Sequence, residues 1–320
     1  MKIRTLSKHF LTALLLAASL AAEAQVKLRF ASQREARKMI VEKDNYIKGM
    51  GQFDLDCRVG HKGATRNELS RLQQDECREF SEGEQDTIRK YMQEIFDIAK
   101  AEGYNLPLPA EEVVFVKTTM KEEGGAGGYT RKNRIYLGQL PPDPKRLKAL
   151  LSHEFFHVLT RNNAEFRRQM YGVIGFSVLD KEIVFGNDVT EARISNPDVS
   201  RYDSYAMLTV GGRRQPCTMM LQTKKEYEGG PFFSYVVICL IPLDDSHRPM
   251  VKDGKTVMYR LDECSDFYEK VGTNTRYVIN PEECLADNFC HLFMDFDKAK
   301  AKGNATYEGV IKVLKEFGVN

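Results

Sequence analysis

The order of the predicted elements indicates a mixed α+β fold, and two observations carry this prediction. Helical spacing dominates the first third of the 320-residue chain and returns near its end, whereas strand-like runs lie between these regions. No internal repeat interrupts this order. With 42% hydrophobic residues, the chain can bury a core in one or two domains.

The amino terminus has the form of a secretory signal peptide. Three basic residues come first: Lys2, Arg4 and Lys8. The apolar run Phe10 to Ala22 follows, and Ala22-Glu23-Ala24 suits signal peptidase. We predict that residues 1–24 are removed before Gln25 and that the protein is secreted or periplasmic. An uncleaved anchor is disfavoured because the run is shorter than the roughly 20 residues that span a bilayer, so the mature chain should have no membrane span.

Charge and cysteine content narrow the kinds of partner and site. The chain has 47 Lys and Arg against 45 Asp and Glu, without a basic cluster that would attract nucleic acid. Seven cysteines follow the signal peptide: Cys57, Cys77, Cys217, Cys239, Cys264, Cys284 and Cys290. In an exported protein some should form disulfides, and the odd number leaves at least one free. None is arranged as CxxC, which leaves little support for a cysteine zinc site.

Residues 25–110 are predicted to form a helical amino-terminal segment. Helical spacing covers residues 26–50 and 65–102, and Gly103 is a suitable end for the second of these helices. The stretch Asn105 to Pro109, with two prolines, then has the composition of a linker.

Residues 111–320 are predicted to form the main domain, which begins with strands. Val113 to Thr119 and Arg134 to Leu137 look like two strands joined by a flexible, glycine-rich turn. A flap that touches substrate and a phosphate cradle are alternatives for this turn, but no Lys-Ser/Thr pair or helix start follows it. Further strands are expected in a β-rich insert at about residues 199–262, where Phe232 to Ile241 is the clearest run.

Helices are expected on both sides of this insert. A cap at Asp143 begins a helix that reaches about Thr160, and a second helix follows near Ala164 to Tyr171. Helical spacing returns near Pro281 to Phe296 and again at Tyr307 to Phe317.

The first of these helices contains the HExxH motif. Residues four apart on a helix lie about 40° apart around its axis, so His153 and His157 can bind one Zn²⁺ together. Glu154 points to the side, where it can take a proton from a water on the metal. Two histidines that are merely hydrogen-bonded inside a packed helix are the alternative. The helix-start signal and the exported context disfavour it.

Two histidines leave a third protein ligand to find. A third histidine close behind the motif is excluded, because Thr160 and Asn163 occupy the positions where glycine and histidine would be needed. The later helix offers Glu283 and Asp287, which are four residues apart and share a face. One can bind metal while the other accepts the outer N–H of a ligand histidine.

HExxH on one helix with Glu-x-x-x-Asp on a later one resembles the gluzincin clan of zinc peptidases, to which thermolysin belongs. The resemblance covers two short helices and implies a zincin-like catalytic domain. It implies that His153, His157 and Glu283 bind zinc, that Glu154 is the catalytic base and that Asp287 holds His153. Glu283 is the only glutamate after His157 that has an aspartate four residues later.

Two features depart from the clan. The segment between His157 and Glu283 is much longer than in thermolysin, and the β-rich insert must fill it. No motif identifies the residue that steadies the oxyanion, for which four tyrosines are candidates: Tyr171, Tyr202, Tyr205 and Tyr277. The clan pairs substrate backbone with an edge strand over the active helix, which implies Val113 to Thr119 or Arg134 to Leu137 here.

The resulting prediction is a secreted zinc-dependent hydrolase that acts as a peptidase on a peptide or protein substrate. A zinc-binding module without catalysis is an alternative that the presence of Glu154 disfavours. A hydrolase of a small amide or ester would have the same site. A latent precursor would use residues 25–110 to cover the cleft until they are clipped. The sequence indicates no oligomeric state.

Overall fold

The computed structural model describes residues 26–109, 111–199, 201–294 and 301–319. The predicted signal peptide, residues 1–24, lies outside this range. None of the helices in the described ranges combines the length and the apolar character that a bilayer crossing requires. The fold is mixed α+β, as predicted, and the described residues form one mixed sheet, one five-stranded antiparallel sheet and one two-stranded antiparallel hairpin.

The first sheet has the strand order β1-β3-β5-β4, and the short strand β2 (Cys77–Arg78) pairs with β3 beside this path. β1 (Lys27–Phe30), β3 (Glu112–Thr118) and β5 (Arg134–Leu137) are parallel. β4 (Gly128–Arg131) runs antiparallel to β5 and forms the edge. The predicted strands at β3 and β5 are confirmed, but the expected hairpin between them is wrong, because β4 makes the hairpin with β5.

The amino-terminal segment is less helical than predicted. The expected helix over residues 26–50 is wrong, because β1 comes first and pairs in register with β3. Short helices follow: α2 (Gln33–Ile40), α3 (Asn45–Gly49) and α4 (Gln52–Val59). The expected helix over residues 65–102 is divided into α5 (Arg66–Asp75) and α6 (Glu82–Glu102). Each begins with a capping box, at Thr65 and Ser81, and these caps fix the starts.

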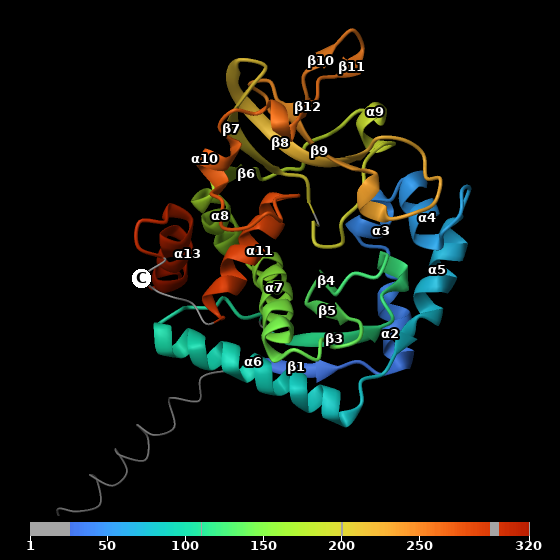
Figure 1. The fold of residues 1–320 in the computed structure, drawn as a ribbon, viewed down its shortest axis with the longest axis vertical. Helices are drawn as coiled ribbons and strands as arrows, with labels where there is room; N and C mark the ends of the chain where they lie inside the picture. Colours follow the sequence, from blue (N-terminus) through green and yellow to red (C-terminus); the bar gives the residue numbers. More distant parts are fainter. Residues whose placement is uncertain (1–25, 110, 200, 295–300, 320) are drawn as a thin grey trace, which may run out of the picture.

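The helices predicted for the main domain are confirmed. α7 (Pro144–Asn162) begins at the Asp143 cap, with Pro144 in its first turn, and α8 (Ala164–Val173) follows. α11 (Pro281–Leu292) ends four residues before the predicted Phe296, and α13 (Ala305–Glu316) lies near the end of the chain. Figure 1 shows α7 and α11 side by side at the centre of the molecule, with α6 crossing below them.

The second sheet is antiparallel, with the strand order β12-β9-β8-β7-β6. Its strands are β6 (Phe176–Val178), β7 (Ser204–Val210), β8 (Arg213–Thr223), β9 (Val236–Pro242) and β12 (Tyr259–Arg260). The short hairpin of β10 (Val251–Lys252) and β11 (Lys255–Thr256) projects from it. Strand structure in the predicted insert is therefore confirmed. The run Phe232 to Ile241 starts with a 3-10 turn at Phe232–Ser234 before β9 begins.

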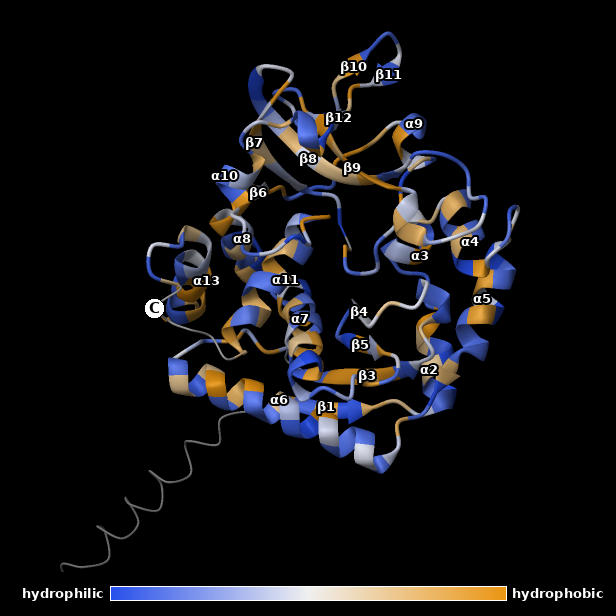
Figure 2. Cartoon of the chain, viewed as in Figure 1, coloured by the Kyte–Doolittle hydropathy of each residue, from blue (hydrophilic) through white to orange (hydrophobic). Residues whose placement is uncertain are grey.

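One hydrophobic cluster joins the helices to both sheets. It contains Ile88 of α6, Phe115 of β3, Phe155 of α7, Leu208 of β7 and Leu285 of α11, all fully buried. In Figure 2 the orange of hydrophobic residues marks β3, while orange and blue alternate along α6, as expected for a helix with one buried face. Because β7 and β8 contribute to this cluster, the β-rich insert packs on the same core as the helices that carry the motif.

The expectation of disulfides is wrong for this structure. All seven cysteines lie in the described part of the chain, and each has a free thiol. Cys284 and Cys290 share α11 and are six residues apart, a rise of about 9 Å along the axis. A disulfide needs Cα atoms within about 7 Å, so the helix itself keeps these two thiols apart.

We expect the packing of β7 to contribute strongly to stability. Leu208→Ala removes a fully buried side chain and should lower the free energy of unfolding by about 2–5 kcal/mol. Met207→Ala is the matched control, because Met207 is next to Leu208 on β7 but points outward and is 38% exposed. Its effect should stay within about 0.5 kcal/mol. Urea denaturation measures both. Equal losses would contradict the inward orientation of Leu208.

Candidate metal centre

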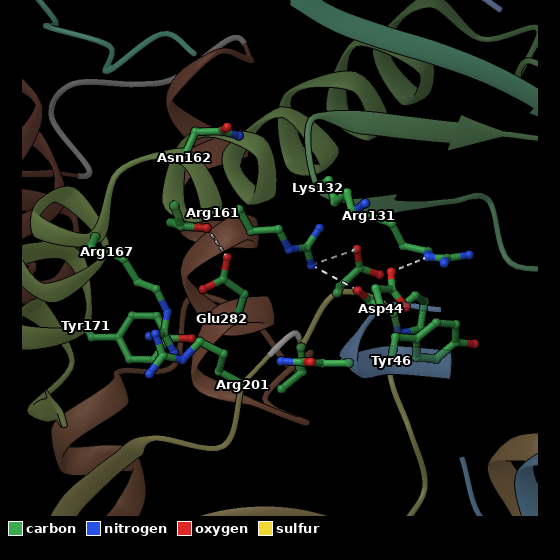
Figure 3. A pocket seen from close by; sticks show the side chains of 16 residues that line it. Asp44, Tyr46, Arg131, Lys132, Arg161, Asn162, Arg167, Tyr171, Arg201 and Glu282 are labelled. Carbon is green, nitrogen blue, oxygen red and sulfur yellow. Dashed lines mark hydrogen bonds and ion pairs between the residues drawn. The ribbon is translucent and has the colours of Figure 1, made fainter. Parts of the chain in front are cut away.

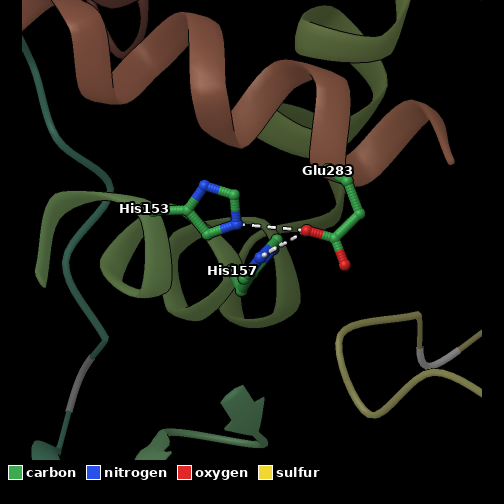
Figure 4. Close-up of side chains that lie close together, drawn as sticks. All are labelled: His153, His157 and Glu283. Atoms are coloured by element: carbon green, nitrogen blue, oxygen red, sulfur yellow. Dashed lines mark hydrogen bonds and ion pairs between the residues drawn. The ribbon is translucent and has the colours of Figure 1, made fainter. Parts of the chain in front are cut away.

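The histidines of the motif face a glutamate from α11. His153 and His157 lie one turn apart on α7, and Glu283 lies near the start of α11. Glu283 Oε2 is 3.1 Å from His153 Nε2 and 3.5 Å from His157 Nε2, and Figure 4 shows the three side chains converging. These ligand atoms all lie within 4.8 Å of one another. The structure therefore brings together the three residues that the sequence predicts as metal ligands.

The chemistry of this group fits a metal ion. His157 is fully buried, and its Nε2 has no hydrogen-bond partner in the described part of the chain. A buried ring nitrogen without a partner is costly, because it has lost its hydrogen bonds to water. A cation placed between the two imidazoles and the carboxylate removes that cost. Two imidazoles and one carboxylate also form a common ligand set for a metal that keeps an open position.

Each histidine is oriented by a carboxylate on its other ring nitrogen. His153 Nδ1 lies 3.0 Å from Asp287 Oδ1, and the Thr275 hydroxyl donates to the second oxygen of Asp287. His157 Nδ1 lies 3.1 Å from Glu282 Oε1, which also accepts a hydrogen bond from the Thr160 hydroxyl. Such contacts fix the tautomer and leave both Nε2 atoms directed at one point.

The contact between Glu282 and His157 was not predicted from the sequence. Glu282 lacks the spacing that marks Glu283 as a ligand, because Ala286, not an aspartate, lies four residues after it. In the structure Glu282 is 4% exposed and contacts the Nδ1 atom of His157, on the side of the ring away from the candidate metal position. Glu283 instead faces the Nε2 atoms of both histidines. Two adjacent glutamates at the start of a buried helix were the available signal, since the two side chains point to different sides of the helix.

Two further residues come from the loop before β7, where the sequence gives no periodic signal. Asn196 Nδ2 donates to Glu283 Oε1 at 2.6 Å, so both oxygens of Glu283 are engaged. Asp198 Oδ1 lies 4.0 Å from His157 Nε2. Glu154, His157 and Asp198 form a second close group of candidate ligand atoms.

Glu154 lies beside the three converging side chains, under the edge strand. It is 3% exposed, and the Thr130 hydroxyl of β4 donates to its Oε2 at 2.8 Å. The approach is close enough that a Cβ added at Gly128 would lie 3.1 Å from Glu154 Oε1. Burial raises the pKa of Glu154, and His157 and His153 oppose that shift.

The electrostatics of the group favour a bound cation. Burial opposes the charged form of His157, but Asp198, Glu282 and Glu283 outweigh it and raise the His157 pKa to about 10. Burial likewise opposes ionised Glu283, yet its contacts with His153 and His157 lower its pKa. In the metal-free protein, protonated imidazoles therefore supply the positive charge that a metal ion would supply among these carboxylates.

A cavity of about 630 Å³ opens beside the group and is lined by His153, Glu154, the glycine-rich turn and Tyr277. Of the four candidate tyrosines, Tyr277 is the one among its lining residues, with its ring centroid 6.1 Å from that of His153. Tyr171 and Tyr202 line other cavities, and Tyr205 contacts His247. Figure 3 shows Tyr171 in its own cavity, beside Arg167 and Glu282.

Comparisons with known proteins identify no relative: no family model, no curated protein and no solved structure matches the chain. The candidate metal site is therefore assigned from the geometry and burial of His153, His157 and Glu283.

We expect both supporting carboxylates to strengthen metal binding. Asp287→Ala and Glu282→Ala should each weaken Zn²⁺ affinity by about 10–100-fold, because each frees one imidazole to turn. Competition with a chromophoric chelator measures the affinity. Glu269→Ala, at an exposed glutamate of the short helix α10 (Phe267–Val271), is the control and should leave it unchanged. Unchanged affinity in Glu282→Ala would show that His157 needs no such support.

Metal binding should also release protons. With a pKa of about 10, His157 is protonated in the metal-free protein at neutral pH, whereas a metal ligand must be a neutral imidazole. Raising the pH removes this proton, so Zn²⁺ affinity should increase from about pH 6 to pH 9. Calorimetric titration in buffers of different ionisation enthalpy measures the release. A binding heat independent of the buffer would contradict it.

Proposed function

We propose that this protein is a zinc-dependent peptidase of the gluzincin type that acts outside the cytoplasm. The observation that carries the proposal is the convergence of His153, His157 and Glu283, with Glu154 held beside them. The geometry fits the roles implied by the HExxH and Glu-x-x-x-Asp patterns. The exported location rests on the predicted signal peptide, residues 1–24.

The ligand set favours zinc over the hard cations. Magnesium and calcium prefer shells of oxygen atoms, whereas two imidazole nitrogens and one carboxylate oxygen suit zinc. Three protein ligands leave a position open for chemistry, as catalytic zinc sites do. When bound, zinc acts as a Lewis acid that polarises a carbonyl and lowers the pKa of water.

Glu154 is proposed as the general base. Its carboxylate is held by the Thr130 hydroxyl on the side of the cavity, close to both imidazoles. It accepts a proton from the attacking water and delivers a proton to the leaving nitrogen, while the hydroxyl oxygen bonds to the carbonyl carbon. The peptide bond breaks to give a carboxylic acid and an amine, with one water consumed.

Tyr277 is proposed to steady the oxyanion that develops on the carbonyl oxygen. Burial and the nearby carboxylates Glu283 and Asp198 raise the Tyr277 pKa, so its hydroxyl stays protonated at neutral pH. A protonated phenol in the cavity can donate a hydrogen bond where negative charge forms.

A peptide substrate is favoured over a small amide by the shape of the site. The cavity is lined by the glycine-rich turn and by the start of the edge strand β4, at Gly128 and Tyr129, so an extended peptide can pair its backbone there. The sequence suggested β3 or β5 for that role. In the structure β5 is covered by β4, and β3 lies between β1 and β5.

The segment of residues 25–110 is proposed to be a permanent part of the catalytic unit instead of a removable cover. β1 pairs with β3 inside the first sheet, and the ends of the segment are tied to the main domain. Asn105, for example, donates from its backbone to Leu314. Clipping this segment would remove a sheet strand, which argues against the latent-precursor alternative.

Glu154→Gln tests the proposal. The variant should keep its fold and bind Zn²⁺ but lose about 10²–10⁴-fold in peptide hydrolysis, because the amide cannot accept the proton. Glu165→Gln, at an exposed glutamate of α8, should retain full activity. Mass spectrometry of a mixed peptide library reports cleavage. A zinc-loaded native protein that cleaves nothing in the library would overturn the peptidase assignment and favour a zinc-binding module.

A further inference from the structure

Near its end, the edge strand β4 contacts Arg161 and the segment Pro197–Asp198, which together we call the wall. Thr130 donates its backbone N–H to Asp198 Oδ1 at 2.7 Å, and its carbonyl accepts from the Arg161 guanidinium. In an antiparallel pair alternate residues direct both backbone groups away from the partner strand. Thr130 is such a residue, and both of its outward groups are already used. A peptide cannot pair with β4 at Thr130.

The wall is held firmly from behind. Arg161 also donates to the carbonyl of Pro197 at 3.0 Å. Two residues before Pro197, Ser195 donates its N–H to Asp54 and accepts from Arg58 through its carbonyl, at 3.0 and 2.9 Å. Asp54 is fully buried and Arg58 is 7% exposed, so these are bonds between desolvated charges and backbone. These hydrogen bonds hold the backbone of the wall in a fixed position.

The wall separates two cavities. The 630 Å³ cavity beside the metal centre and a second one of about 410 Å³ have only Pro197 and Asp198 in common among their described lining residues. Figure 3 shows the second cavity, where Arg161 and Arg131 are paired with neighbouring carboxylates. A peptide bound at the metal centre therefore extends into the larger cavity and stops at the wall.

On these grounds, and resting on the proposed peptidase function, we propose that the protein is an aminopeptidase: the free amino terminus of the substrate stops at Asp198. The wall presents the carboxyl group of Asp198 to the metal-side cavity. Burial and the neighbouring Glu154 raise the pKa of Asp198 in the substrate-free protein, and an adjacent ammonium group favours its ionised form. The ionised carboxylate binds the ammonium group through a charge-assisted hydrogen bond.

The charges of the larger cavity favour an amino over a carboxyl terminus. Its one guanidinium among the described lining residues, that of Arg58, is already paired with Asp54 and Glu123. The acidic groups Glu154, Asp198 and Asp287 also line it. A substrate α-carboxylate would meet these groups without a free cation to bind it, whereas an α-ammonium group finds several acceptors.

The rest of the peptide then lies along the glycine-rich turn. Gly128 lies two residues before Thr130 on β4, so its backbone N–H and C=O groups also point away from β5. Gly128 lines the larger cavity. Apolar side chains line the cavity around this path: Leu150, Ile194, Phe232, Phe233 and Ile279. We therefore expect substrates with large apolar side chains near the free amino terminus.

Matched peptides test the assignment in the zinc-loaded native protein. One set has a free amino terminus, a second is N-acetylated, and a third has both ends blocked. Mass spectrometry should show removal of single residues from the free amino end and at least a tenfold lower rate for the acetylated set. Internal cleavage of the doubly blocked peptides at a comparable rate would overturn the aminopeptidase assignment while leaving the peptidase assignment intact. No cleavage of any set would overturn both.

A binding measurement separates recognition from turnover. Zinc-loaded Glu154→Gln should bind a fluorescent peptide with a free amino terminus at least tenfold more tightly than its N-acetylated form. Adding Asp198→Asn keeps an oxygen that can accept from Thr130 but removes the charge, so this preference should disappear. Asp245→Asn, at an exposed aspartate, is the matched control and should preserve it. Equal affinity for the two peptides in the Glu154→Gln protein would overturn the role of Asp198, whether or not the double variant folds.

Discussion

The packing of α7 against α11 buries a group of charges that must balance one another. His157, Glu154, Glu282 and Glu283 are all at most 4% exposed, and Asp198 is 8% exposed. Isolated carboxylates at such burial would cost several kcal/mol each, so their presence depends on compensating positive charge. In the metal-free protein the protonated imidazoles supply this charge, and a metal ion held by the same residues would supply it in their place. Much of the surrounding structure can be understood as the means of holding these side chains in place.

The supports come from parts of the chain that are far apart in sequence. Thr130 of the edge strand holds Glu154, and Asn196 of the loop before β7 holds Glu283. Asp54 and Arg58, from the amino-terminal segment, hold the same loop through the backbone of Ser195. Each support is a hydrogen bond at a buried or partly buried position, where hydrogen bonds to charged groups are stronger than in water. The site is therefore a property of the whole fold, although its motif lies on one helix.

The sequence allowed α7, α11 and the three converging candidate ligands to be predicted because their signals are local. Helical spacing places His153 above His157, and the four-residue interval places Glu283 and Asp287 on one face. The strand β4 was missed because its four residues, Gly128–Arg131, begin inside the glycine-rich turn and are too few to show an alternating pattern. Asn196 and Asp198 were missed for a different reason: their roles depend on tertiary contacts across the fold, which no periodicity records. The break between β1 and α2 likewise reflects pairing with β3, which overrides a weak helical spacing.

The distribution of the ligands over α7 and α11 has a consequence for how the protein is made. A chain is synthesised from its amino end, so both histidines exist well before Glu283 and its supporting carboxylates are added. Binding at two imidazoles alone is weak compared with a complete site, because metal affinity is coupled to the folding that assembles all ligands. A growing chain that carries only His153 and His157 would therefore hold a metal ion weakly. In the proposed zinc enzyme, metal loading would therefore come late in maturation, after Glu283 has been made and α11 has packed against α7.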